Sequence, residues 1–347
     1  MRRAARVLTG LVLLLLSIII VGLALFGGLA IWFRAPLPAP FPLAVALLYG
    51  ATCLFCLVML WRASPSLTAA WPALGLLAVT FIGFFIWWGS ISPRADRIWA
   101  APLARMPTTQ IEGDRFTIQN VRNFRWRKAA NPKPDSSGEE IAEERWETRT
   151  YDLTKVAGVD LFFSYWTGPL IAHLLVSITF DDAAPLTFSI EIRREEGEVY
   201  SALAGFFKSY ELAIVAADEA DIVQLRTHVW REDVRLYRLN VGREKARALL
   251  LAYAAEIDAL AARPRWYDTL GANCSTVAFR LARKLWPELR FDWRILFPGY
   301  APDYAYEIGA VRTDIPLEEL KRRAAISELA RALPEGADFS VGVRAGR

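Results

Sequence analysis

Cys274 is the residue best placed for covalent chemistry, and it lies in the stretch WYDTLGANCSTVAFRLARKL, residues 266–285. Asn273 precedes it and Ser275 follows it, at the predicted first turn of an amphipathic helix. A helix N-terminus and a nearby imidazole both lower the pKa of a thiol, from about 8.5 to roughly 3.5–7.5. This position suits a nucleophile, with backbone N–H groups at 273–275 as candidate oxyanion donors. The alternative is a small buried side chain at a helix start.

A nucleophilic thiol needs a base, and the chain offers two histidines. His173 lies in IAHLLVSITF, residues 171–180, a predicted strand in which it faces away from Ala172 and Leu174. His228 lies among arginines and acids in QLRTHVWRED. A strand holds a side chain rigidly, so His173 is the preferred base. A surface or satisfied core histidine is the alternative reading.

A third group could orient the imidazole through its second nitrogen. The next predicted strand, LTFSIEIRRE at residues 186–195, supplies Glu191. An ion pair of Glu191 with Arg193 or Arg194 is the competing interpretation, and Glu195 is held in reserve. The predicted catalytic set is therefore a cysteine, a histidine and a glutamate.

A dense polar block, ADEADIVQLRT at residues 216–227, stands apart from these three residues. Arg226 and Arg231 could bind a phosphate or carboxylate of a ligand. A solvated ion-pair network that holds a loop is the simpler interpretation.

The elements that would position these residues form an α+β domain over residues 113–347, after a connector at 92–112. Its sheet is predicted to be mostly antiparallel and to precede the cysteine helix. Further strands are predicted at 113–127, 159–166 and 234–241, helices at 200–212, 242–263 and 316–333, and an exposed loop at 128–147.

The first 91 residues are predicted to form three transmembrane helices. Apolar runs at 7–33, 41–61 and 71–88 carry no charge and have about the length that spans hydrocarbon. The first run is too long for the apolar core of a cleaved signal peptide. Cys53 and Cys56 lie inside the second run, where we expect them to pack as small apolar side chains.

Arginine placement predicts the orientation of the spans. Three arginines precede the first span and Arg62 follows the second, whereas the loop at 34–40 holds Arg34 alone. Such residues concentrate on the cytoplasmic side. We therefore expect a multi-pass membrane protein with its C-terminal domain outside the cytoplasm. Cys274 would then be an unpaired thiol in an oxidising compartment.

The net charge of +4 comes from the apolar third of the chain. Residues 1–93 hold five arginines, no lysine and no acid, which leaves 36 basic residues (41 minus 5) and 37 acidic residues for 94–347. The domain outside the membrane is thus close to neutral, so nucleic acid is not expected as a partner. Two separated histidines and one thiol predict no metal site, and no phosphate-binding glycine motif predicts a nucleotide. No cofactor is expected.

Several ordered stretches carry a resemblance to the Lnb N-terminal periplasmic domain family, over roughly residues 95–345. These stretches are GDRFTIQNVRNFRWR, VDLFFSYWTGPLIAHLLVSITF, FSIEIRREEGEVYSALAGFFKSYELAIVAADEADIVQLRT, VRLYRL, WYDTLGANCST and DFSVGVR. The family is similar to permuted papain-like (NlpC/P60) cysteine enzymes, and its named member is a bacterial lipoprotein N-acyltransferase. The resemblance implies Cys274 as nucleophile, His173 as base and Glu191 as third member. Three N-terminal spans are an addition to that pattern.

The expected function is a membrane-anchored cysteine acyltransferase or hydrolase that acts on membrane lipid or lipoprotein through an acyl-thioester. A cell-wall peptide amidase or peptidase would use the same three residues, and an apolar slot rather than a polar cleft would separate the two. A non-catalytic envelope scaffold is the third reading, which predicts Cys274 buried and His173 out of hydrogen-bond reach. The acyl donor, the acceptor and the oligomeric state are left open.

Overall fold

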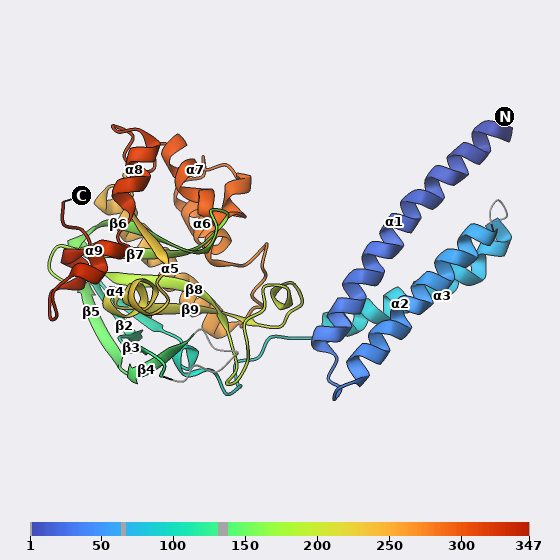
Figure 1. The fold of residues 1–347 in the computed structure, drawn as a ribbon, viewed down its shortest axis with the longest axis horizontal. Helices are drawn as coiled ribbons and strands as arrows, with labels where there is room; N and C mark the ends of the chain where they lie inside the picture. Colours follow the sequence, from blue (N-terminus) through green and yellow to red (C-terminus); the bar gives the residue numbers. More distant parts are fainter. Residues whose placement is uncertain (1, 64–66, 131–137, 347) are drawn as a thin grey trace. The chain divides into compact units, whose positions relative to one another are not determined.

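The computed structural model describes residues 2–63, 67–130 and 138–346 (Figure 1). The chain divides into two compact units. One contains Met1–Pro93 with Ala202–Ser209, and the other contains Arg94–Ser201 with Tyr210–Arg347. The first unit is helical and the second has mixed α+β structure.

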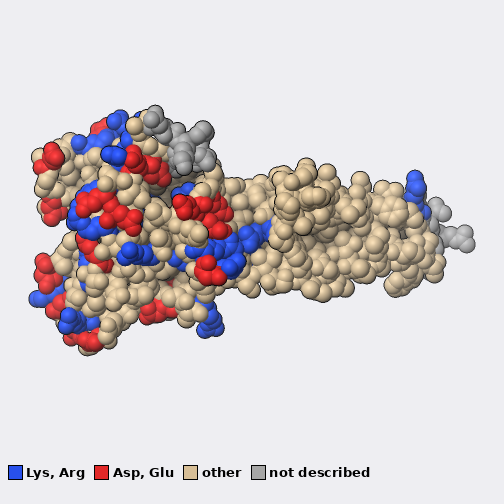
Figure 2. Space-filling model, turned by 90° about the horizontal axis from the view of Figure 1, so that it is seen from below, with Lys and Arg blue, Asp and Glu red and all other residues tan. Residues whose placement is uncertain are grey.

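Three long helices form the first unit: α1 (Arg2–Arg34), α2 (Phe41–Ala63) and α3 (Leu67–Ser90). Each contains a stretch of the described residues that is long and apolar enough to cross a membrane. Figure 2 shows this unit almost free of charge on the face in view, whereas acids and bases intermix over the α+β unit. Cys53 and Cys56 are buried between the helices, in an apolar cluster.

The segment Ala202–Ser209, which lies between two strands of the α+β unit in sequence, belongs to the helical unit. The ring of Phe207 stacks on Phe33, with centroids 5.4 Å apart. Lys208 Nζ donates to the carbonyl of Trp88 at 2.7 Å and lies over its indole ring. The predicted helix at 200–212 is therefore wrong: these residues pack on the membrane helices and contain only a short 3₁₀ turn, Ala204–Phe206.

An eight-stranded sheet forms the centre of the second unit, in the order β1-β2-β9-β8-β7-β6-β10, with β5 also paired to β2. Every pairing is antiparallel except a short parallel contact between β2 and β9. The strands are β1 (Thr108–Glu112), β2 (Arg115–Arg122), β5 (Trp146–Asp152), β6 (Val156–Thr167), β7 (Ile171–Phe180), β8 (Leu186–Arg193), β9 (Glu211–Ala217) and β10 (Asp233–Arg238). A separate hairpin pairs β3 (Arg125–Lys128) with β4 (Glu139–Glu143).

Helices cover both faces of the sheet. One face buries Leu174, Val176 and Ile190 against α5 (Arg243–Ala262), α6 (Cys274–Leu285), α7 (Ala301–Glu307) and α8 (Leu317–Ala324). The other buries Leu175 and Val215 against α4 (Glu219–Gln224), α9 (Ser327–Ala332) and α10 (Phe339–Gly342). Because side chains alternate along a strand, consecutive residues of β7 enter different cores.

The sequence-based fold class is confirmed: three apolar helices precede a mixed α+β domain whose sheet comes before the cysteine helix. Two further expectations need correction. The predicted loop at 128–147 contains β4, although residues 131–137 lie outside the described part of the chain. The predicted helix at 316–333 is two helices, because the N–H of Ile326 donates to Val234 and Ala325 bridges to β10.

Candidate active site

Cys274 is the first residue of α6, and Asn273 caps that helix. The Oδ1 of Asn273 accepts from the N–H of Ser275 at 3.1 Å and from the N–H of Thr276 at 2.9 Å. Thr276 Oγ1 in turn accepts from the N–H of Asn273 at 2.9 Å, which completes a capping box. Reciprocal bonds of this kind fix the start of a helix and therefore the position of its first side chain.

The same bonds change the expectation for an oxyanion site at 273–275. The N–H groups of Asn273 and Ser275 donate within the cap, and Ser275 Oγ donates to the carbonyl of Ile295 at 2.6 Å. Asn273 and Ser275 therefore support the helix start. The N–H of Cys274 remains as the candidate oxyanion donor of the three.

His173 reaches the thiol from the sheet, where the β7–β8 pairing stops. The last paired residues are Leu175 and Ser189, so the two strands separate before His173 and Glu191 would meet. The backbone N–H of Leu174, next to this point, donates to the Cys274 sulfur. This opening explains how an imidazole on one face of the sheet meets a thiol on the other.

Cys274 and His173 are hydrogen-bonded and stabilise each other's charged form. Burial raises the pKa of the Cys274 thiol, but the charge and hydrogen bond of His173 outweigh it, so the net pKa is lowered. Burial lowers the pKa of His173, but Glu191 and Cys274 raise it to about 9. An opposite charge at close range favours ionisation of both partners. The arrangement therefore favours a thiolate–imidazolium pair.

Glu191 and Ser189 lie on the far side of the imidazole. His173 Nε2 is 2.7 Å from Ser189 Oγ and 3.2 Å from Glu191 Oε1. Ser189 Oγ donates to the same carboxylate oxygen at 2.5 Å. Because Nε2 is engaged here, Nδ1 is the ring nitrogen left for the thiol. Ser189 was missed in the sequence, although its spacing two residues before Glu191 places both on one face of a strand.

Arg226 lies beside Glu191 and is buried, so it is not an exposed residue that could bind an anion from solvent. It is 4% exposed, and its Nη2 lies 3.3 Å from Glu191 Oε1. It occurs in a π-helical turn, Leu225–Val229, that continues α4. Turns of this kind are often found at functional sites. Arg231, the second predicted anion-binding residue, is exposed and has a left-handed backbone with φ of 57°.

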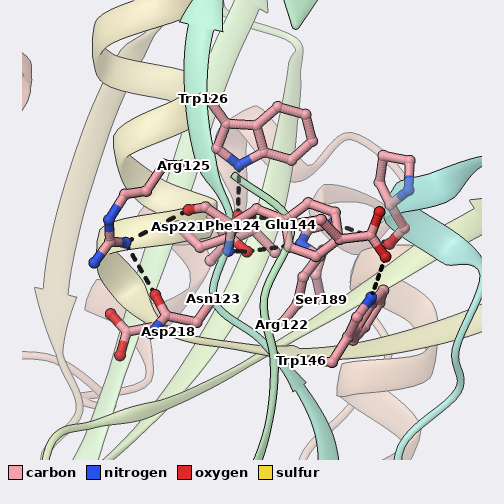
Figure 3. Close-up of polar contacts among 12 residues, drawn as sticks. Arg122, Asn123, Phe124, Arg125, Trp126, Glu144, Trp146, Ser189, Asp218 and Asp221 are labelled. Carbon is pink, nitrogen blue, oxygen red and sulfur yellow. Dashed lines mark hydrogen bonds and ion pairs between the residues drawn. The ribbon is translucent and has the colours of Figure 1, made fainter. Parts of the chain in front are cut away.

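The helix that carries Arg226 is fixed by a buried carboxylate, Asp221 (Figure 3). Asp221 accepts from Arg122 Nε at 2.9 Å, from the N–H of Phe124 at 2.8 Å and from Trp126 Nε1 at 2.7 Å. A buried carboxylate that accepts this many hydrogen bonds holds its helix in one place.

The remaining candidates lie elsewhere. Glu195, the reserve for the third position, forms an ion pair with Arg97. His228 Nδ1 is 2.9 Å from Thr227 Oγ1, and burial lowers its pKa. Two tyrosines that sequence reasoning missed, Tyr200 and Tyr267, interact electrostatically with Cys274, and burial raises the pKa of each. No motif around them signals this placement.

An apolar pocket of about 770 Å³ lies beside α6. Its wall includes Leu174 and Tyr253, both neighbours of the thiol, and Ser275, the residue after it. Most of the other lining residues are apolar, among them Leu161, Phe163, Leu249, Phe279, Trp286 and Leu289. Glu288 and Arg290 also line it and are exposed. The volume lies within the range of roughly 300–1,000 Å³ that is usual for small-molecule sites.

Within the described ranges of the chain, no group of three or more histidine, cysteine or acidic side chains is arranged to hold a metal ion.

Fold and site together define a class: a membrane-anchored α+β protein in which a helix-borne cysteine meets a sheet-borne histidine and glutamate. Residues 142–299 match the family model of the Lnb N-terminal periplasmic domain, which confirms the resemblance. The matched range contains Cys274, His173 and Glu191. Neither the curated proteins nor the solved structures gave a match to this chain. Together with the three helices of the described residues that are long and apolar enough to cross a membrane, this match indicates a membrane protein with a periplasmic domain.

Proposed function

We propose that this protein is an acyltransferase or hydrolase of the bacterial inner membrane, which acts on lipid or lipoprotein through an acyl-thioester on Cys274. The observation that carries the proposal is the convergence of a thiol with lowered pKa, an imidazole and a carboxylate at one helix N-terminus. A nucleophile, a base in hydrogen-bond reach and a group that orients the base are the parts that such catalysis needs.

In the first half-reaction, the Cys274 thiolate attacks the carbonyl carbon of an ester and forms a C–S bond. The developing oxyanion lies near the N–H of Cys274 at the helix N-terminus. The C–O bond to the alcohol then breaks, and the His173 imidazolium gives its proton to the departing oxygen. The acyl group is left as a thioester, with His173 neutral.

In the second half-reaction, an amine or a water molecule attacks the thioester carbonyl. Neutral His173 takes a proton from the attacking group, the C–S bond breaks, and the thiolate and imidazolium are regenerated. An amine acceptor gives an amide, and water gives a carboxylic acid. Glu191 keeps its charge throughout and stabilises the imidazolium.

The pocket beside α6 favours acyl chemistry over cleavage of cell-wall peptide. Its lining is mostly apolar and reaches the residues next to the thiol, which suits a hydrocarbon chain better than a polar peptide. The three membrane spans support the same choice, because they keep the enzyme at the surface where lipid substrates are concentrated. A non-catalytic scaffold predicts a buried Cys274 with His173 out of hydrogen-bond reach. The half-buried thiol and its hydrogen bond to His173 do not favour that alternative.

The test uses the full-length protein in vesicles that contain a phospholipid with a labelled acyl chain. We expect a covalent acyl adduct on the wild-type protein that neutral hydroxylamine removes, as it does a thioester. Cys274→Ala should lose the adduct. Cys274→Ser should lose it or retain an ester that resists neutral hydroxylamine. The double variant Cys53→Ala/Cys56→Ala is the matched control and should label like the wild type. A hydroxylamine-sensitive adduct that persists in Cys274→Ala would rule out this mechanism.

A further inference from the structure

Three polar side chains meet at one carboxylate oxygen, Glu191 Oε1. Ser189 Oγ lies 2.5 Å from it, His173 Nε2 lies 3.2 Å from it, and Arg226 Nη2 lies 3.3 Å from it. Ser189 is fully buried and Arg226 is almost so. Three elements therefore hold the carboxylate: β7 through His173, its own strand β8 through Ser189, and the π-helical turn after α4 through Arg226.

The direction of these hydrogen bonds fixes the form of the imidazole. Ser189 Oγ donates its proton to the carboxylate, so it can only accept from His173 Nε2. Nε2 therefore carries a hydrogen in the neutral as well as the charged imidazole. Nδ1 is then the basic nitrogen, on the side of Cys274. Ser189 thus selects the tautomer that can take the thiol proton.

Arg226 has more hydrogen-bond donors than its contacts with Ile222 and Glu191 use. Its Nη1 donates to the carbonyl of Ile222 at 2.8 Å and its Nη2 faces Glu191, but its buried Nε has no hydrogen-bond partner among the described residues. A buried and incompletely paired guanidinium is costly to retain. Asp221, with Arg122 and Trp126, fixes the helix from which Arg226 projects.

We propose that Arg226 and Ser189 are positioning residues of this site, which hold Glu191 and the imidazole in register so that His173 presents Nδ1 to Cys274. Neither residue contacts the reacting atoms. The inference deepens the proposed function, on which it rests for its catalytic meaning, but the geometry it describes can be measured without any substrate.

The charged groups that face His173 are Glu191 from β8, Arg226 from the turn after α4, and Cys274 from α6. Burial lowers the pKa of His173, Glu191 and Cys274 raise it, and Arg226 lowers it. Removal of the guanidinium charge should therefore raise the pKa of His173 above its value of about 9. Lysine at this position keeps the charge but loses the planar fork.

The experiment is an NMR titration of ¹⁵N-labelled histidine in the full-length, untagged protein in detergent micelles. A His228→Gln background leaves His173 as the single histidine. We expect Arg226→Gln to raise the His173 pKa by roughly one pH unit, and Arg226→Lys to leave it near the wild-type value. The exposed Arg263→Gln is the matched control and should cause no shift.

Ser189→Ala tests the second residue by the same method. In the neutral imidazole of the wild-type protein, the ¹⁵N shifts should show hydrogen on Nε2. The variant should populate the other tautomer measurably, because the acceptor at 2.7 Å is lost. A variant that merely weakens the fold would lower the melting temperature without changing these shifts.

The inference is overturned if Arg226→Gln leaves the His173 titration unchanged or if Ser189→Ala leaves the tautomer unchanged. The proposed function fails by a different result, an acyl adduct that does not depend on Cys274. Where acyl transfer is also measurable, we expect Arg226→Gln to slow it about tenfold, because Glu191 and the imidazole are then held less precisely.

Discussion

The charge state of the Cys274 thiol depends on His173 from β7 and Glu191 from β8. His173 lowers the pKa of Cys274, while Glu191 opposes that effect on the thiol and raises the pKa of His173. We expect the ion pair to predominate between these two pKa values, from the lowered pKa of the thiol up to about pH 9. Below this window the thiol is protonated, and above it the imidazole has no proton for the leaving group. Activity should therefore follow a bell-shaped pH profile.

At the scale of elements, the helix cap and the end of the β7–β8 pairing bring the thiol and the imidazole together. Asn273 fixes the first turn of α6, and the separation of β7 from β8 after Leu175 gives the sulfur access to the Leu174 N–H. Both features are local, so a defect in either should move the thiol without unfolding the sheet.

Asn273→Ala removes the acceptor for two backbone N–H groups and is expected to lower the free energy of unfolding by about 0.5–2 kcal/mol. The reason is that the first turn of α6 loses its capping box. Thermal or denaturant unfolding in detergent measures the change. Asn240→Ala, which loses one exposed bond to Gly309, is the control and should cost less. Equal effects of the two substitutions would contradict the assigned role of the cap.

Much of this arrangement could be predicted from sequence, because local patterns determine it. The alternation in IAHLLVSITF predicted β7 with the bounds that the structure shows, Ile171–Phe180. GANCST likewise indicated a capped helix start. Ser189 and Arg226 could not be assigned in this way, because their meeting at Glu191 depends on strand register and on a π-helical turn.

The errors have a common physical cause, which is contact between distant segments. Residues 200–212 have helical composition, but Phe207 packs on rings of α1 and the chain then enters β9 at Glu211. The helix predicted at 316–333 is interrupted because Ala325 bridges to Arg235 of β10. Neither contact leaves a periodic signal in the local sequence.

At the scale of the whole molecule, the three candidate spans and the placement of arginines around them predict which side of the membrane carries the site. If each of the three candidate spans crosses the membrane, the N-terminus and Cys274 are expected on opposite sides. The arginine distribution predicts a cytoplasmic N-terminus, so we expect the thiol outside the cytoplasm.

A membrane-impermeant maleimide tests this topology in intact spheroplasts of the expressing bacterium. In a Cys53→Ala/Cys56→Ala background, Cys274 should be labelled without lysis. In the same background with Cys274→Ala, an Arg62→Cys thiol in the last turn of α2 should be labelled only after lysis. The reverse pattern would contradict the predicted orientation.

The pH dependence of Cys274 alkylation tests the central claim most directly. The full-length Cys53→Ala/Cys56→Ala protein has one thiol, and its reaction with iodoacetamide reports the thiolate fraction without any substrate. We predict an inflection below the ordinary value of about 8.5, and its return toward that value in His173→Ala. An inflection at or above the ordinary value in the protein with His173 intact would show that no thiolate–imidazolium pair forms and would contradict the account.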